Sequence, residues 1–292
     1  MRKRRGSRIV LAAALAAVSS LAAAEDPVEA GVPELAGARA IAMSAYRGVA
    51  AGNDGLFTNA ASLASRRRYT LETGWVLGRR GADTDFQAYT ASVVDSAMES
   101  TTGGFAYTRI PSGPWQGNLL HGALAFPLTQ RFFVGATAKY LSLNGPQNGE
   151  IRAGNVDASA FLQVASTVTV GVSGYNLINA GHKAIQPRGL GTGIAVGDER
   201  HFQVAADWRG DFDRKGKLTN LYAVGGEVLA GDLVPLRAGY LRDETRDASA
   251  WSVGAGFVST AGFALDLSYR QGIERSDDRT IAVALKLFVF SG

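Results

Sequence analysis

The chain offers three histidines for metal binding or acid–base chemistry: His121, His182 and His201. No two of them lie at a spacing that would place both side chains on one face of a helix or hairpin, so a zinc site is not predicted. There is no cysteine, which removes thiolate nucleophiles and thiolate metal ligands. The Gly-x-Ser-x-Gly elbow of serine hydrolases is also missing, although the many serines leave a serine–histidine lipid hydrolase as an open alternative. We therefore predict a protein that is not an enzyme and that uses no metal or cofactor.

Ten charged residues form a second candidate set, because each alternates with apolar residues in a short segment. They are Glu72, Lys139, Asp157, Asp207, Arg209, Glu227, Arg237, Asp266, Arg270 and Lys286. Unpaired charges in a dry interior would be prohibitively costly, so the face that carries them must be hydrated or cross-paired. The charges either cross-link a polar interior or select ions. Their balance of acids and bases favours cross-linking.

The segments that carry these charges have the period of β-strands. In one segment Phe263, Leu265 and Leu267 point to one face. Asp266 and Arg270, which alternate with them, point to the other face. The segments with this pattern span residues 68–77, 84–94, 102–110, 116–126, 131–142, 152–163, 167–177, 188–197, 201–210, 218–229, 233–242, 249–259, 263–271 and 279–290.

An even set of about fourteen amphipathic strands predicts an all-β fold, a transmembrane antiparallel β-barrel. A soluble β-sandwich also alternates, but here the apolar face continues over more strands than one sandwich core uses. Aromatic residues recur near the segment ends, as at a membrane interface: Tyr69, Trp75, Trp208, Tyr240, Trp251 and Tyr269. A barrel of this size is too wide to be filled by its wall alone, so a plug or water must fill its lumen.

Residues 1–24 are predicted to be a secretory signal peptide, cleaved after Ala24. They have a basic head and an apolar middle shorter than the ~20 residues of a membrane-spanning helix. The leader carries five of the 30 basic residues, so the mature chain is nearly neutral and composition does not support a nucleic-acid partner. Residues 25–66 do not alternate and are predicted to form a plug of short helices and turns inside the barrel of residues 67–292.

Two stretches of the predicted plug resemble the outer-membrane barrel superfamily that includes the fatty-acid transporter FadL and the PorV/PorQ proteins. One is the run 37–40, Gly-Ala-Arg-Ala. The other is the plug motif 59–64, Asn-Ala-Ala-Ser-Leu-Ala, which is similar to the family pattern Asn-Pro-Ala-Gly-Leu-Ala through Asn59, Ala61 and Leu63. Ala60 stands at the family proline and Ser62 at the family glycine, which predicts a less rigid loop.

The resemblance continues along the predicted strands, for example in residues 103–107 and 236–240. It implies a fourteen-stranded outer-membrane barrel whose N-terminal segment lies inside. It also implies two non-enzymatic functions. The FadL side implies a conduit for small hydrophobic molecules, and the PorV side implies an anchoring or shuttle subunit of a larger cell-envelope assembly, such as a secretion, surface or motility complex.

Loop length and charge favour the anchoring subunit over the conduit. A conduit needs an apolar pocket and long capture loops, yet the barrel region uses about sixteen residues per strand and turn, and a spanning strand itself takes about 9–11. The predicted lumen is also charged. We therefore expect outer-membrane lipid and other envelope proteins as partners, with a hydrophobic small molecule as the alternative. The polar stretches 181–189 and 242–247 are the predicted partner contacts, unless they are only solvated turns.

Overall fold

The computed structural model describes residues 37–49, 52–81, 84–97, 100–145, 149–178, 181–183, 185–212 and 216–289. The predicted signal peptide and the first part of the predicted plug lie outside the described residues. No helix of the described segments is long and apolar enough to cross a bilayer.

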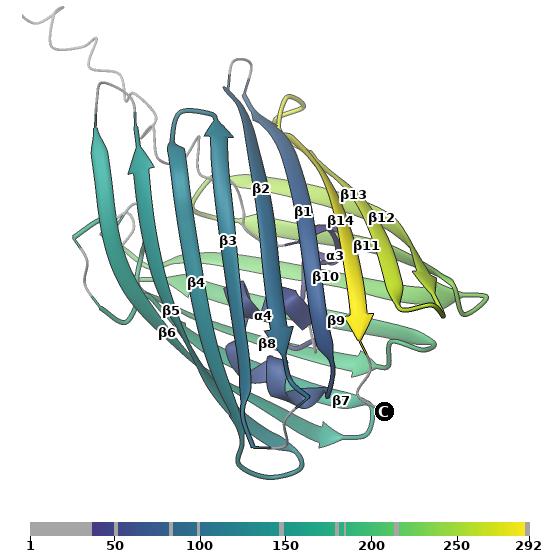
Figure 1. Cartoon of the computed structure of the whole chain (residues 1–292). Helices are drawn as coiled ribbons and strands as arrows, with labels where there is room; N and C mark the ends of the chain where they lie inside the picture. Colours follow the sequence, from purple (N-terminus) through teal and green to yellow (C-terminus); the bar gives the residue numbers. More distant parts are fainter. Residues whose placement is uncertain are drawn as a thin grey trace, which may run out of the picture.

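Fourteen antiparallel strands close into one barrel (Figure 1). Each strand pairs with its neighbours in the chain, and pairing of β1 with β14 closes the ring. The strands are β1 (Tyr69–Arg80), β2 (Thr84–Asp95), β3 (Thr102–Ser112), β4 (Gln116–Pro127), β5 (Phe132–Asn144), β6 (Glu150–Ala165), β7 (Val168–Tyr175), β8 (Gly189–Gly197), β9 (Phe202–Asp211), β10 (Thr219–Ala230), β11 (Val234–Asp243), β12 (Ala248–Ser259), β13 (Phe263–Gly272) and β14 (Arg279–Val289). The fold class predicted from the alternation is confirmed.

The alternating pattern separates the two faces of the wall. In β13, Leu265 and Leu267 are 40% and 49% exposed, whereas Asp266 between them is 2% exposed. Leu265 is paired with Leu285 on β14, so apolar side chains face outward on adjacent strands. The outer wall is therefore greasy and the inner wall polar or small, because successive strand side chains point to opposite faces.

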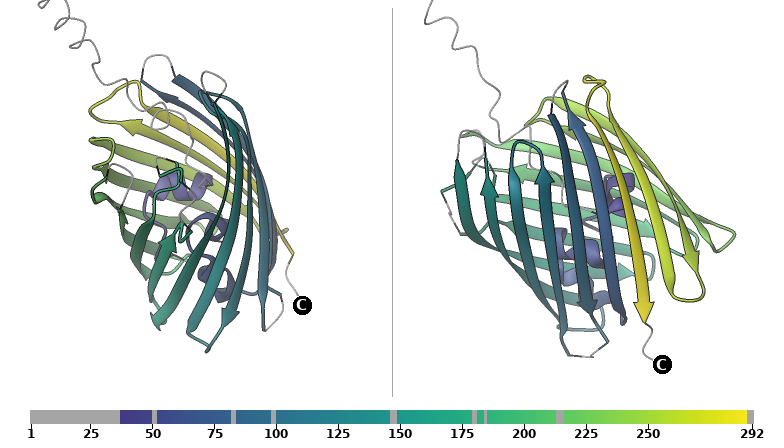
Figure 2. Two further views of the ribbon diagram at one scale, coloured as in Figure 1. Left: turned by 90° about the vertical axis from the view of Figure 1, so that its left-hand side faces the viewer. Right: turned by 45° about the horizontal axis from the view of Figure 1, so that its top comes forward.

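The two ends of the barrel differ in their connections. One end, here called the long-loop end, carries the loops 176–188, 212–218 and 273–278. The other, the short-turn end, carries the connections 166–167, 231–233 and 260–262, together with the start of β1 and the end of β14. Figure 2 shows both ends from two further directions.

In the part of the chain that the structure describes, four short helices lie inside the ring (Figures 1 and 2). They are α3 (Ala38–Met43), η1 (Gly52–Asp54), α4 (Gly55–Thr58) and η2 (Ala60–Ser65). Helix α3 packs against β10 to β14, and η2 packs against β4 to β6 on the other side of the lumen. The described part of this segment, here called the plug, therefore bridges the barrel from wall to wall.

Candidate functional site

Glycines in the wall let the plug backbone lie directly on the strands. A Cβ at Gly225 of β10 would lie 1.8 Å from the carbonyl oxygen of Met43, and a Cβ at Gly171 of β7 would lie 2.0 Å from that of Arg47. No other residue permits such an approach, because its Cβ would overlap the plug backbone. The wall is thus shaped to receive the plug at fixed positions.

An alternating series of charges fixes the plug at the short-turn end. We call it the ion ladder; in order it consists of Arg66, Glu199, Arg39, Glu227, Arg237, Asp266, Lys286 and Glu72. Arg39, on α3 of the plug, is its centre. Its Nη2 lies 2.8 Å from Glu227 Oε1 and its Nη1 lies 3.1 Å from Glu199 Oε1. The plug is therefore bonded to β10 and to the β8–β9 turn at once.

The rest of the ion ladder runs along the wall. Arg237 of β11 contacts Glu227 and places Nη1 2.6 Å from Asp266 Oδ1. Lys286 of β14 follows, with its Nζ 3.3 Å from Asp266 Oδ2 and 3.7 Å from Glu72 Oε2. Every charge that stands inside the series has a neighbour of opposite sign on each side. Such pairing offsets the desolvation cost of burying the ions.

Two carboxyl groups, one in the ion ladder and one close to it, have pKa values shifted in opposite directions. Burial alone would raise the pKa of Glu199, but the charges of Arg39, Arg66 and Arg68 outweigh it and lower the pKa to about 2. Burial raises the pKa of Asp54 in the plug above its ordinary value, although the carboxyl accepts a hydrogen bond of 2.6 Å from the Gly37 N–H. A guanidinium cluster thus keeps Glu199 charged in a buried place.

A second anchor joins the plug to β9. The Oδ2 atom of Asp207 accepts hydrogen bonds from the backbone N–H groups of Tyr46 and Arg47, at 2.7 and 2.8 Å. The guanidinium of Arg47 adds an ion pair at 3.3 Å and donates from Nε to the hydroxyl of Tyr175 at 3.0 Å. That hydroxyl in turn donates to the Thr58 carbonyl oxygen at 2.9 Å. One wall carboxylate therefore holds the turn that follows α3.

The remaining predicted charges also face the lumen. Lys139 of β5 lies 2.7 Å from Asp157 Oδ1 and donates to Asn176 Oδ1 at 2.6 Å. Arg209 pairs with Asp211 at 2.8 Å, and Arg270 donates to the Ile41 carbonyl oxygen at 3.1 Å. The structure thus distributes the ten predicted residues over the ion ladder, the Asp207 anchor and these further contacts. Their arrangement favours cross-linking over ion selectivity.

The plug motif 59–64 lies against β4 to β6. Asn59 donates from Nδ2 to the Ala160 carbonyl oxygen at 3.1 Å, and the Ala61 N–H donates to Ser159 Oγ at 3.0 Å. Leu63 is buried in a small apolar cluster, and Ala60 is buried beside it. At the position of the family glycine, Ser62 donates from Oγ to the Asn59 carbonyl oxygen at 2.8 Å, which ties the turn together.

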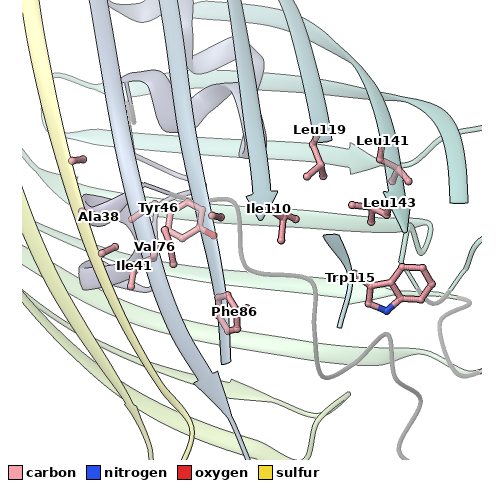
Figure 3. Close-up of a cluster of buried hydrophobic side chains, with 14 of the residues drawn as sticks. Ala38, Ile41, Tyr46, Val76, Phe86, Ile110, Trp115, Leu119, Leu141 and Leu143 are labelled. Carbon is pink, nitrogen blue, oxygen red and sulfur yellow. The ribbon is translucent and has the colours of Figure 1, made fainter. Parts of the chain in front are cut away.

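Above the plug, at the long-loop end, the lumen is hollow. The cavity has a volume of about 340 Å³, and Tyr46, Arg47, Phe57 and Thr58 of the plug form its floor. One side is a continuous apolar cluster that rises from α3 along β2 to β5 (Figure 3). Its largest residues are Phe86, Ile110, Trp115, Leu119, Leu141 and Leu143, and of these Phe86, Leu119 and Leu141 line the cavity.

The opposite side of the cavity carries basic residues. Arg209, Arg246 and Arg270 line it, and Arg209 and Arg246 are paired with Asp211 and Asp278. Leu221 and Leu241 also line this side, and Lys139 lies on the side of the apolar cluster, so the lining mixes apolar and charged side chains.

One further polar side chain at the cavity, His121, has a buried ring nitrogen that makes no hydrogen bond within the described residues. His121 of β4 lies edge-on against the Phe57 ring, with ring centroids 4.9 Å apart. Its Nδ1 atom has no hydrogen-bond partner among the described residues. Within those residues no group of three or more His, Asp or Glu side chains is placed to hold a metal ion.

Sequence reasoning missed the plug partners of the wall charges. Arg39 is visible only as part of the resemblance, and Arg47, Glu199 and Arg66 are in none of the predicted sets. The ten wall charges are balanced among themselves, so their count gives no sign that the plug contributes. The available signal is the presence of arginines in a segment that is rich in small and apolar residues.

Fold and site together define a transmembrane antiparallel β-barrel of fourteen strands, crossed by an N-terminal plug and hollow at one end. No family model matches the chain, and no curated protein matches it. Among solved structures it is similar to the CymD monoaromatic hydrocarbon channel, with 15% identity and a TM-score of 0.66 over 88% of this chain and 97% of that one.

Two further structures have the same fold. The P. putida toluene transporter TodX is 10% identical, with a TM-score of 0.68 over 88% of this chain and 99% of that one. A Pseudomonas aeruginosa FadL homologue is 14% identical, with a TM-score of 0.59 over 89% and 98%. The FadL side of the predicted resemblance therefore agrees with the fold. The PorV side has no counterpart among these structures.

Proposed function

We propose that the protein is a non-enzymatic conduit for small hydrophobic molecules across the bacterial outer membrane. The observation that carries this proposal is the cavity of about 340 Å³ above the plug. Its volume lies within the range of about 300–1,000 Å³ typical of small-molecule sites, and such sites are mostly apolar with a few placed polar groups. Phe57, Phe86, Leu119 and Leu141 supply apolar surface to this cavity, and polar side chains such as His121 and Lys139 lie among them.

Both sequence arguments against a conduit are weakened by where the residues lie. Half of the ten predicted charges lie in the ion ladder at the short-turn end, whereas Lys139, Arg209 and Arg270 line the cavity beside its apolar residues. The long-loop end keeps an apolar wall. The loop 176–188 contributes Ile185 and Gln186 to the cavity, so a capture surface exists without a long insertion.

The similar structures support the same function. They include a monoaromatic hydrocarbon channel and a toluene transporter. The anchoring subunit favoured by loop length has no support from these relatives, and part of its predicted contact surface, the stretch 181–189, borders the cavity instead. The conduit therefore replaces the anchoring subunit as the preferred function.

The geometry suggests the order of events. A molecule enters at the long-loop end, loses water against Leu119 and Leu141, and reaches the plug at Phe57. Apolar contact supplies the affinity, at roughly 25 cal/mol per Å² of buried surface. Onward passage requires a path past the plug. The ion ladder holds the plug on the side of α3, and the plug motif contacts β4 to β6 on the other side.

Filling the cavity tests the proposal. The double variant Leu119→Trp/Leu141→Trp places two indoles against the apolar wall, and should reduce binding of tritiated toluene to the purified barrel at least tenfold. Leu124→Trp is the matched control, because Leu124 lies on the same strand β4 but is 54% exposed on the outer face. It should bind as the wild type does. Equal binding by both variants would place the ligand elsewhere.

A further inference from the structure

Two small cavities continue from the large one toward the short-turn end, between the plug and the β1–β2 hairpin. The large cavity borders β1 at Arg79. A second cavity of about 20 Å³, here called the middle cavity, borders β1 from Val76 to Glu72. A third of about 10 Å³, here called the end cavity, borders Thr70 and the preceding Arg68. The cavities therefore follow one another along the inner face of β1.

The same order holds on β2, which is paired antiparallel with β1. The large cavity borders Phe86. The middle cavity borders Thr90 and Ser92, and the end cavity borders Val94. Two paired strands thus show the same succession, so the three cavities form a series from the long-loop end to the short-turn end. We call the middle and end cavities together the seam.

Two side chains of the plug separate these cavities. Phe57 of α4 lines both the large cavity and the middle cavity. Asn53 of η1 lines both the middle cavity and the end cavity. Asn53 is 2% exposed and donates from Nδ2 to Ser92 Oγ on β2 at 2.8 Å. Movement of Phe57 would therefore join the large cavity to the seam, and movement of Asn53 would join the two parts of the seam.

The seam is a polar part of the interface between plug and wall. The Oδ1 atom of Asn53 is buried and has no hydrogen-bond partner among the described residues. The middle cavity has room for one water molecule, which needs about 10–15 Å³ and polar partners, and Thr90 and Ser92 line the same space. Water in the middle cavity would complete the hydrogen bonding of Asn53. Separation of the plug from the hairpin at this place therefore exposes polar groups that water can solvate.

Ion pairs fix the plug to other parts of the wall. Arg39 is paired with Glu227 of β10 and with Glu199 of the β8–β9 turn. Arg47 is paired with Asp207 of β9. Because these partners lie outside the β1–β2 hairpin, the pairs can hold the plug while η1 and α4 move away from β1 and β2.

We propose that the seam is the onward path of the conduit past the plug, and that Phe57 and Asn53 close it at two successive points. This inference rests on the proposed function and adds the route. A ligand in the large cavity contacts Phe57 at the floor. Passage follows when α4 and η1 move away from the hairpin and open the seam toward the short-turn end. The ion ladder and the Asp207 anchor remain bonded, so the plug stays in the barrel.

The chain has no cysteine, so a pair of introduced thiols tests the path. Asn53→Cys/Ser92→Cys replaces the hydrogen bond between η1 and β2 by a disulfide, which mass spectrometry detects and dithiothreitol opens again. In cells whose outer membrane contains this variant, uptake of tritiated toluene should fall at least tenfold in the oxidised state and return on reduction. Toluene binding to the purified barrel should be the same in both states, because the large cavity is unchanged.

The possible outcomes separate the path from the proposed function. Equal uptake in the oxidised and reduced states would overturn the seam as the path and leave the conduit in place. Absence of toluene binding and uptake in the wild type would instead contradict the conduit itself.

A second thiol pair is the matched control. Ser44→Cys/Ser252→Cys joins the turn after α3 to β12, where the two hydroxyl oxygens lie 2.9 Å apart. This side of the plug stays in place in the proposed movement, so oxidation should leave uptake unchanged. Loss of uptake on oxidation of the control would mean that the whole plug must move, which would contradict the assignment to the seam.

A filling variant gives an answer that does not depend on disulfide formation. Gly74 of β1 lines the middle cavity, and a Cβ there meets only the Val283 carbonyl oxygen, at 3.6 Å. Gly74→Val should therefore occupy the seam and lower the uptake rate at least threefold without changing toluene binding. Gly122→Val adds the same side chain to β4 where a Cβ meets no atom within 4 Å, and should have no effect. Unchanged uptake by Gly74→Val would also overturn the proposal.

Discussion

The two ends of the lumen are enclosed by the same strands but are lined by different kinds of side chain. At the short-turn end, Arg39 of the plug joins a continuous series of buried ions, and the plug backbone lies against wall glycines. At the long-loop end the wall turns apolar on β2 to β5 and a cavity remains. The comparison teaches that the ion ladder fixes the plug at one end, while the space left above the plug is available for a ligand.

The difference follows from desolvation. A buried ion is tolerated when ions of opposite sign surround it, and the ion ladder meets that condition by drawing on the plug as well as the wall. The cavity at the other end is lined by charged side chains such as Lys139 and Arg209 and also by Phe86, Leu119 and Leu141. Its apolar part favours molecules that water excludes.

Among the variants considered, interruption of the ion ladder should lower the free energy of unfolding most. Arg237→Leu leaves Glu227 and Asp266 without the cation that joins them, and removal of one partner from a buried ion pair costs about 3–5 kcal/mol. Urea unfolding of the barrel in lipid vesicles measures this loss. Arg152→Leu is the control, because its pair with Glu150 is exposed and such pairs contribute about 0–1 kcal/mol. Equal stability of the two variants would show that the ladder does not hold the barrel together.

The stability of the short-turn end should also depend on acid pH through Glu199. The folded pKa of about 2 lies below the ordinary value of 4.5, so the stabilising contribution is complete above pH 4.5 and is lost as the pH falls toward 2. The shift corresponds to about 3 kcal/mol. The difference in unfolding free energy between wild type and Glu199→Gln should therefore shrink over this interval. A difference independent of pH would contradict the assigned charge.

A smaller effect is expected where the plug touches the wall. Gly225→Ala forces a methyl group against the Met43 carbonyl, and overpacking of this kind costs about 1–3 kcal/mol. Gly122→Ala is the control, because a Cβ at Gly122 meets no atom within 4 Å. Limited proteolysis of the folded barrel should release the plug from the first variant and not from the second. Identical digestion patterns would mean that the plug does not need the glycine.

The smallest effect is expected at the plug motif. Asn59→Ala removes the hydrogen bond to the Ala160 carbonyl oxygen, and such bonds contribute about 0.5–1.5 kcal/mol. Thermal unfolding measured by circular dichroism should show a small loss of stability. Gln130→Ala, an exposed position in the connection between β4 and β5, should change stability less. The reverse order would remove the motif from the contacts that hold the plug.

The sequence predicts the strands closely because alternation is a local property. Each residue of β13, for example, reveals its face by comparison with its neighbours. The same logic places Asp266 and Arg237 on the inner wall, but it does not reveal which charges meet. Pairing across β10 to β14 depends on register, and the role of Arg39 depends on where the plug folds back.

The conduit is harder to predict than the strands for a related reason. A count of charges over the whole lumen favours the anchoring subunit, whereas the position of each charge along its strand supports the conduit. Glu227, Lys286 and Glu72 all lie close to the strand ends at the short turns. Leu119 and Leu141 lie toward the other end, where they form part of an apolar wall. The overall composition of the lumen does not reveal this wall.

Uptake is the most direct measurement of the central claim. Cells whose outer membrane contains the full-length protein should take up tritiated toluene faster than cells without it, and Leu119→Trp/Leu141→Trp should bring the initial rate down to the background. Leu124→Trp should leave the rate unchanged at equal abundance in the membrane. Undiminished uptake by a folded, cavity-filled barrel would contradict the account.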